Sequence, residues 1–412
     1  MFEKIMIVLQ VFFGLVGLYQ LVLSFFGWYR KKESKSHSPQ KTFAVIVAAH
    51  NEEEVIGALL ENLQKMRYPR EMYDIFVICD NCTDNTVAIT NSFEGVTACV
   101  RNNPDKRGKG YALEWMLDKL WKMPKSYDAV VVFDADNLVD VDFLQYMNDD
   151  LCNGKQVIQG YLDTKNPNDS WISASNAINY WFCNRLWQLP RYNLGLSNFL
   201  GGTGMCFESK LLKEMGWGAT SLVEDLEFTV RCIQRNVYPK INFDARVYDE
   251  KPLTFKASAR QRLRWMQGHF EVTRKYMFPL LKQGIKERSL TKIDAALYVF
   301  NSYNFLIGFL LTIIYYINYM LPTDLNLISI YGYLPLWVSI PFSIYGIMQC
   351  PLAMYLEKVP WKTYLRLVFY PIFLISWWPI TFWAFFTQNN KQWSHTKHTR
   401  VVRLEEVQSK QG

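Results

Sequence analysis

Residues 129–136 read Ala-Val-Val-Val-Phe-Asp-Ala-Asp, an apolar run that ends in two carboxylates. The apolar run predicts a buried strand that stops at Asp134. Because side chains two residues apart leave a strand on the same face, Asp134 and Asp136 are expected to emerge together. Paired carboxylates suit Mg²⁺ or Mn²⁺, hard cations that prefer oxygen ligands and substrate phosphate. The stretch therefore predicts a divalent-metal site at the end of a strand.

Strands and helices alternate along the chain around this stretch. The predicted strands are 43–49, 75–79 and 97–100, and the predicted helices are 52–65, 84–91 and 111–120. Such alternation indicates an α/β domain with a mainly parallel sheet and helices on both faces. Ligands of these sheets bind beyond the carboxyl ends of the strands, which is the edge where Asp80 and Asp134 fall.

A long apolar segment precedes this domain. Residues 5–29 carry no charge, and the segment is long enough to cross the ~30 Å hydrocarbon core of a bilayer. The basic run 30–32 that follows is expected on the cytoplasmic side. A cleavable signal peptide is the alternative, but the segment is long and no clear small-residue cleavage site follows it. We therefore expect a retained transmembrane anchor.

Further apolar segments follow the domain, and they predict spans at 295–321 and 325–356. A third stretch, 364–386, contains Pro371 and Pro379 and has basic residues beyond both of its ends. The positive-inside rule therefore places both ends on the cytoplasmic side. We expect a re-entrant or interfacial element, broken at the prolines, in place of a full crossing.

Two amphipathic segments rich in aromatic residues come before these spans. For 171–189, core packing and a position in the membrane interface are both open. Residues 258–278 have a stronger basic face and lie just before the spans, so we expect them at the interface.

The composition fits a chain that combines a polar domain with membrane segments. Of the 412 residues, 50% are hydrophobic and 20% are charged, and the net charge is +7. Basic residues gather beside the apolar segments, as in membrane proteins with a positive inside. Because no basic run alternates with stacking aromatic residues in the polar part, we expect no nucleic-acid partner. The eight cysteines lack the paired CxxC spacing of a zinc site, so reduced thiols are expected.

Two motifs near the predicted sheet edge suit a nucleotide. Asp80 ends the second predicted strand and can accept hydrogen bonds from a uracil edge or a ribose hydroxyl, whereas Thr83 and Asp84 are expected to cap a helix. Residues 107–110 read Arg-Gly-Lys-Gly before a predicted helix, where backbone amides and Lys109 can approach a phosphate. The spacing of a Walker loop is absent.

Further along the chain, Glu224-Asp225 begins a predicted helix, and 261–265 reads Gln-Arg-Leu-Arg-Trp. On a helix, residues three and four apart share a face, so Gln261, Arg264 and Trp265 are expected side by side. Arginine can bind phosphates through two hydrogen bonds. An ordinary basic interfacial helix is the alternative for this segment.

In this order, the Asp-x-Asp pair, Glu224-Asp225 and the Gln-x-x-Arg-Trp motif resemble those of the processive family-2 glycosyltransferases, the group of cellulose, hyaluronan, chitin and poly-N-acetylglucosamine synthases. The resemblance covers 42–267 by motif and the whole chain by architecture. It implies an α/β catalytic domain of the GT-A type, which is Rossmann-like, and an α-helical transmembrane region. The implied partners are a UDP-sugar donor, a growing polysaccharide and the lipid bilayer, and the implied cofactor is Mg²⁺ or Mn²⁺.

The resemblance also implies an arrangement in the plasma membrane, with several crossings and a cytoplasmic catalytic domain. The predicted parts are a transmembrane helix at 1–32, a catalytic domain at 42–257, interfacial helices at 258–290, a C-terminal transmembrane region at 291–390, and a cytoplasmic gating loop and tail at 391–412.

Residue roles follow from the matched positions. Asp225 is implied as the base that accepts the proton of the acceptor hydroxyl, and the role of Glu224 stays open. Val223 stands where the family has threonine, and His50 stands where it has tyrosine. The implied substrate-binding residues are Asn51, Glu52, Asp80, Lys109, Asp134, Gly202, Thr203, Gln261, Arg262, Arg264, Trp265, Trp393, Thr396 and Arg400. Gly202 and Thr203 can also form a plain tight turn, and Trp393, Thr396 and Arg400 a disordered basic tail.

The expected reaction is processive, inverting transfer from UDP-glucose to a β-glucan that is extruded during growth. UDP-N-acetylglucosamine is the alternative donor. A second hypothesis is a non-processive enzyme that glycosylates a lipid. A third is a transporter or receptor whose polar domain only binds nucleotide sugars.

Overall fold

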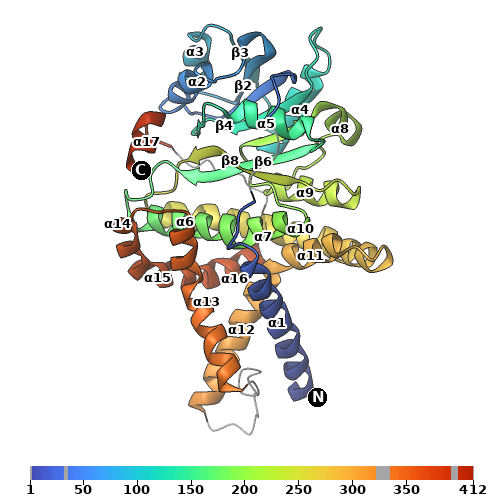
Figure 1. Ribbon diagram of the computed structural model, residues 1–412, viewed down its shortest axis with the longest axis vertical. Helices are drawn as coiled ribbons and strands as arrows, with labels where there is room; N and C mark the ends of the chain where they lie inside the picture. Colours follow the sequence, from blue (N-terminus) through green and yellow to red (C-terminus); the bar gives the residue numbers. More distant parts are fainter. Residues whose placement is uncertain (1, 32–35, 322–334, 391–397, 412) are drawn as a thin grey trace.

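The computed structural model describes residues 2–31, 36–321, 335–390 and 398–411. A domain built on a sheet lies above a layer of helices, and α1 (Phe2–Phe25), α12 (Asn301–Met320) and α13 (Leu336–Leu356) project from the far side of that layer (Figure 1). By length and composition, these helices and the stretch Trp361–Thr387 could each cross a membrane.

The sheet has eight strands in the order β3-β2-β1-β4-β7-β6-β8-β5. Their bounds are β1 Phe43–Ala49, β2 Tyr73–Asp80, β3 Val96–Arg101, β4 Ala129–Asp134, β5 Leu138–Val139, β6 Val157–Thr164, β7 Met205–Glu208 and β8 Lys240–Asp249. The strands β1 to β4 are parallel, as the sequence predicts, and β6 is parallel to β8. The expected mainly parallel sheet is nevertheless mixed, because β7 runs antiparallel to β4 and β6, and β5 antiparallel to β8.

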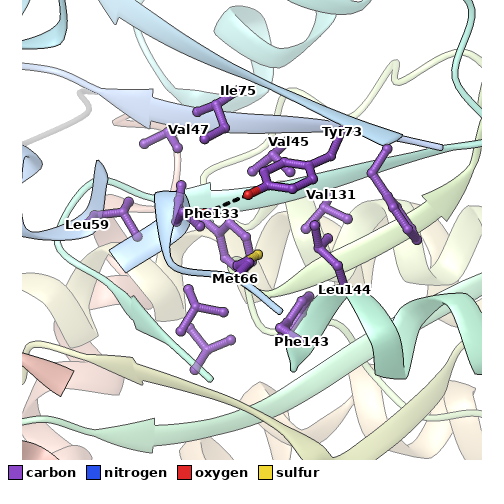
Figure 2. Packing of buried hydrophobic residues seen from close by; sticks show 14 of the residues in the cluster. Val45, Val47, Leu59, Met66, Tyr73, Ile75, Val131, Phe133, Phe143 and Leu144 are labelled. Atoms are coloured by element: carbon purple, nitrogen blue, oxygen red, sulfur yellow. Dashed lines mark hydrogen bonds between the residues drawn. The ribbon is translucent and has the colours of Figure 1, made fainter. Parts of the chain in front are cut away.

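Helices cover both faces of the parallel half. They are α2 Ile56–Gln64, α3 Thr86–Asn91, α4 Lys109–Leu120, α5 Phe143–Cys152, α8 Ser209–Met215 and α9 Glu224–Gln234. Alternate residues of β1 supply the two cores: Val45 and Val47 pack with α2, whereas Ala44 and Ile46 pack with α4. Figure 2 shows the first core, with Leu59 of α2 against the strands. Burial on both faces explains the uninterrupted apolar runs of these strands.

The layer beneath the sheet comprises α6 Trp171–Phe182, a π-helical segment Cys183–Gln188, α7 Leu189–Asn193, α10 Phe255–Lys286 and α11 Leu290–Val299. In α6, Ile178 and Trp181 are buried against Tyr161 of the sheet and against Met354 and Phe373 of the apolar helices. The segment 171–189 is therefore packed between the sheet domain and the projecting apolar helices. A short C-terminal helix, α17 Leu404–Gln411, completes the described elements.

The third apolar stretch is broken, as expected, into α14 Trp361–Tyr364, a 3₁₀ segment Leu365–Phe369, α15 Tyr370–Ile375 and α16 Trp377–Thr387. The break between α15 and α16 lies at Ser376, not at either proline. Pro371 and Pro379 each fall in the first turn of a helix, where the missing N–H has no intrahelical partner to lose. The α16 helix packs on α10, with the rings of Phe270 and Phe385 5.5 Å apart.

Candidate active site

A cavity of about 830 Å³ lies between the carboxyl edge of the parallel strands and the helical layer. It is lined by residues at the ends of β1, β2 and β4, at the starts of α4 and α9, and on α10. The residues predicted from the sequence that line it are Glu52, Asp80, Lys109, Asp134, Asp136, Gly202, Thr203, Glu224, Asp225, Gln261, Arg264 and Trp265.

The Asp-x-Asp pair emerges where β4 ends, and the loop after Leu200 holds it in place. The Thr203 hydroxyl accepts a hydrogen bond from the backbone N–H of Asp134 at 3.0 Å. Lys109 forms an ion pair with Asp134 and donates to the carbonyl oxygen of Gly202 at 2.6 Å. Burial opposes the charge on Lys109, but Asp134 and Glu224 outweigh burial and raise its pKa. A cation therefore already faces this edge of the cavity.

Asp136 has a separate set of contacts. Its carboxylate accepts a hydrogen bond from the backbone N–H of Glu250 at 2.9 Å. Burial opposes the charged form, but His398 and Lys165 outweigh it and lower the pKa of Asp136. This carboxylate is therefore ionised at neutral pH and ready to bind a cation.

The donor chemistry of this edge fits a divalent cation. Within the described ranges, no group of three or more His, Cys, Asp or Glu side chains is arranged to hold a metal ion. The carboxylates of Asp134 and Asp136 suit Mg²⁺ or Mn²⁺ completed by water and substrate phosphate, because both are hard cations that prefer oxygen ligands.

The part of the cavity that the sequence predicts to bind a nucleotide is built by the ends of β1 and β2. Asp80 is buried and forms an ion pair with Arg101 at 2.5 Å, and His50 Nδ1 lies 2.6 Å from the Asp80 carbonyl oxygen. Asn51, by contrast, does not line the cavity. Its backbone has a φ of +56°, and its side-chain oxygen accepts the backbone N–H of Thr83 at 2.7 Å. The structure gives Asn51 a turn-forming role, since asparagine tolerates a positive φ, and its substrate role stays a prediction.

Glu224 and Asp225 occupy the first turn of α9 inside the cavity. Burial and the neighbouring Asp225 raise the pKa of Glu224 to about 7. Burial also raises the pKa of Asp225. Gly202 approaches closely, because a Cβ added there would lie 3.4 Å from Asp225 Oδ2, and its φ of +86° favours glycine. A buried carboxylate with a raised pKa is suited to accept a proton.

The Gln-x-x-Arg-Trp motif lies on α10, where Gln261, Arg264 and Trp265 line the cavity. Arg262 does not, which corrects its predicted substrate role. Its guanidinium is fully buried on the other side of α10 and donates to Ser376 Oγ at 2.8 Å. It also lies 4.4 Å from the ring centroid of Phe373. Arg262 therefore joins α10 to the broken helix α15–α16.

The C-terminal tail reaches the same cavity. His398 lines it and lies 3.1 Å from Glu52, while the Glu250 carboxylate accepts the backbone N–H groups of Thr399 and Arg400. Burial disfavours the imidazolium, but Asp136, Glu52 and Glu250 outweigh it and raise the pKa of His398 to about 9.

The residues of the predicted gating loop are Trp393, Thr396 and Arg400, and the structure describes only Arg400. The Arg400 side chain pairs with Asp169 at 3.1 Å and does not line the cavity, so its predicted substrate contact is not found. Trp393 and Thr396 lie outside the described residues.

Several lining residues had no assigned role in the sequence analysis: Tyr180, Asp249, Glu250, His269, Tyr298 and His398. Helical spacing could have identified His269, which follows Trp265 by four positions. The others come from segments that only the fold brings together.

Comparisons with known proteins agree with this geometry. Residues 39–268 match the family described as glycosyltransferase like family 2. The beta-monoglucosyldiacylglycerol synthase of Nostoc sp. is 27% identical over 257 residues, which cover 60% of this chain and 52% of that enzyme. The chain thus spans about half the length of that relative. The poly-beta-1,6-N-acetyl-D-glucosamine synthase of Staphylococcus epidermidis is 23% identical over 394 residues, which cover 90% and 89% of the two chains.

Among solved structures, the mannosyltransferase PcManGT from Pyrobaculum calidifontis, in complex with GDP-Man and Mn²⁺, has a TM-score of 0.57. The structural similarity covers 93% of this chain and 99% of that chain. At 17% identity, it shows a shared fold and nothing more.

Proposed function

Because the chain belongs to glycosyltransferase-like family 2 and has a GT-A fold, we propose that it is an inverting, membrane-bound transferase that uses a UDP-sugar. One observation carries the proposal: a single cavity joins Asp134 and Asp136, the base candidate Asp225, and the α10 motif. The groups proposed to bind a nucleotide diphosphate and to activate an acceptor hydroxyl therefore line one cavity.

The proposed reaction begins with the donor at the sheet edge. Asp80 accepts hydrogen bonds from the nucleoside, while Lys109 and Arg264 bind the diphosphate. When bound by Asp134 and Asp136, Mg²⁺ or Mn²⁺ supplies positive charge that stabilises the leaving diphosphate.

Asp225 acts on the acceptor side. Its carboxylate takes the proton of the acceptor hydroxyl as that oxygen bonds to the anomeric carbon and the bond to UDP breaks. Attack from the face opposite to the diphosphate inverts the anomeric centre. The raised pKa of Asp225 supports this role, because a carboxylate with a raised pKa accepts a proton more readily than an ordinary surface carboxylate does.

We propose UDP-glucose as the first donor to test, with a β-glucan as product. UDP-N-acetylglucosamine is the second donor, supported by the Staphylococcus relative that aligns over 90% of the chain. The same full-length alignment supports a growing polysaccharide as acceptor, extended from the side of the cavity that faces the helical layer.

A lipid acceptor is the second candidate function. It is supported by the Nostoc relative, which the comparisons name as a synthase of a glucosyldiacylglycerol. It is also supported by the loose packing of α1, α12 and α13, because only 6% of the apolar stretch of each helix is buried within the described residues. A lipid could therefore reach the helical layer from the side, and the same Asp225 would activate its hydroxyl.

The test uses purified full-length protein with Mn²⁺ or Mg²⁺ and a panel of radiolabelled UDP-sugars. We expect metal-dependent UDP release that is lost on chelation and in Asp136→Asn, and a product that grows into a long chain digestible by β-specific hydrolases. A single labelled sugar on a lipid would support the second candidate. Absence of UDP release with every donor would refute both.

A further inference from the structure

The cavity has a second end, away from the nucleotide edge, which the helical layer supplies. Trp265 and His269 lie one turn apart on α10, and Tyr298 comes from α11; all three line the cavity. These helices lie between the sheet and the projecting spans (Figure 1). This end therefore faces the region from which an acceptor would arrive.

His269 presents an imidazole that the protein does not use. Its side chain is half-buried, and within the part of the chain that the structure describes the ring nitrogens have no hydrogen-bond partner. Burial lowers the pKa of His269 to about 4, so the ring is neutral at physiological pH. A neutral imidazole has one N–H donor and one acceptor nitrogen, and a hydroxyl group can likewise both donate and accept a hydrogen bond.

Tyr298, which lines the same cavity, is held rigidly. Its ring stacks on Phe199 with the centroids 3.5 Å apart, and the Arg191 guanidinium lies 5.3 Å from the Tyr298 ring centroid. Arg191 is fully buried and binds Asp294 through two hydrogen bonds of 2.8 and 2.9 Å. Asp294 precedes Tyr298 by one turn of α11 and also accepts the Tyr19 hydroxyl at 2.7 Å. This side of the cavity wall is therefore fixed before any ligand binds.

An aromatic wall that also carries the His269 imidazole favours one acceptor chemistry over the other. A sugar ring has an apolar C–H face that packs on aromatic side chains and hydroxyls at its edge that need partners. A diacylglycerol has one hydroxyl, which the base takes up, and its two ester groups can only accept hydrogen bonds, so they leave the acceptor nitrogen of the imidazole unpaired. A buried polar group left unpaired penalises the wrong ligand.

We infer that His269 determines acceptor specificity by binding a hydroxyl of an acceptor sugar, with Trp265 and Tyr298 as the walls of that subsite. The inference rests on the proposed function, and it selects a glycan over a simple lipid alcohol as the acceptor. It assigns His269 a binding role and leaves proton transfer to Asp225.

The test compares wild type, His269→Ala and His269→Asn, all full length, with β-linked tetrasaccharides of glucose and of N-acetylglucosamine and with dioleoylglycerol as acceptors. His37→Ala removes an imidazole far from the cavity and serves as the matched control. We expect His269→Ala to raise the KM for the tetrasaccharide about tenfold, the effect of one lost hydrogen bond, and to change the KM for the donor less than twofold. Asparagine, which keeps a donor and an acceptor, should restore part of the loss.

Two outcomes overturn the inference: equal changes in the KM values for donor and acceptor in His269→Ala, or wild-type transfer to dioleoylglycerol and to no tetrasaccharide. Unchanged unfolding temperature and elution volume show that a raised KM does not arise from misfolding. Failure of the proposed function looks different, because wild type would then release no UDP from any donor.

Discussion

Two adjacent acids, Glu224 and Asp225, begin α9 inside the cavity. Burial and the charge of Asp225 raise the pKa of Glu224 from an ordinary 4.5 to about 7. The folded protein therefore holds a proton on Glu224 more tightly than the unfolded chain does. The free energy of unfolding therefore falls as the pH rises from 4.5, the pKa in the unfolded chain, to about 7, the pKa in the folded protein. Above that pH the lost stability is not regained.

Glu224→Gln should therefore stabilise the ligand-free protein at pH 8 by about 2–3 kcal/mol, because glutamine has no charge to bury. Below about pH 4.5 the variant and wild type should unfold at the same temperature, since Glu224 is then protonated in both states. Thermal unfolding between pH 4 and pH 8 checks this. Glu94→Gln, at an exposed acid, is the control, and an equal effect of both substitutions would contradict the assignment.

At this scale, the residues that share the cavity could be predicted where local geometry decides. Arg264 and Trp265 follow Gln261 by three and four residues, so the three side chains share one face of the helix. The helical turn between Gln261 and its neighbour puts Arg262 on another side of α10, so the helix geometry itself predicts that Arg262 faces away from the cavity. The turn-forming role of Asn51 could not be predicted, because its positive φ belongs to a turn that the sequence alone does not display.

Among the elements, the strands β1, β2 and β4 could be predicted because both of their faces are largely apolar and buried. The strand β6 could not, although every one of its residues is buried. It carries Gln159 and Asp163, and each has partners from distant segments: Gln159 binds Gly201 and Thr203, and Asp163 binds Arg246. Buried polar residues that are paired across the fold leave no apolar pattern in the local sequence.

The helices α7 and α11 are joined by a buried ion pair. Arg191 and Asp294 are almost fully enclosed, and Tyr19 of α1 adds a hydrogen bond to Asp294. Since Arg191 also lies against Tyr298, the pair supports the cavity wall from beneath. A buried ion pair of this kind affects stability chiefly when one partner is removed, because the other charge then stays buried without a counter-charge.

Asp294→Ala should therefore destabilise the protein by about 3–5 kcal/mol, because Arg191 remains buried without a counter-charge. Tyr19→Phe removes one hydrogen bond and should cost about 1 kcal/mol. Unfolding temperatures in detergent measure both. Replacing the pair together, with Arg191→Met and Asp294→Leu, should recover most of the loss, and a double variant as unstable as Asp294→Ala would contradict this explanation.

Across the whole molecule, the break at Ser376 resolves a conflict in the charge pattern. Both ends of the third apolar stretch are flanked by basic residues, and α16 packs along α10 in the helical layer (Figure 1). The tail that follows returns to the catalytic domain, where α17 packs through Leu404 and Val407 on Leu138 and Tyr248. We propose that α1, α12 and α13 cross the plasma membrane and that 361–387 stays on the cytoplasmic side.

This topology predicts that the C-terminus and the catalytic domain lie on one side and the N-terminus on the other. In inside-out membrane vesicles, protease should remove a C-terminal tag and digest the domain, while an N-terminal tag stays protected. Right-side-out vesicles should give the reverse pattern and serve as the control. A C-terminal tag protected in inside-out vesicles would mean that 361–387 crosses the membrane.

The most direct measurement is sugar transfer by wild type and Asp225→Asn, side by side, with the product bond analysed by NMR. We predict a β-linked product from the α-linked UDP-sugar in wild type. In Asp225→Asn we predict at least a hundredfold loss of transfer, with UDP-sugar binding retained, because the amide cannot take the acceptor proton. Full activity in Asp225→Asn, or an α-linked product in wild type, would contradict inverting transfer with Asp225 as the base.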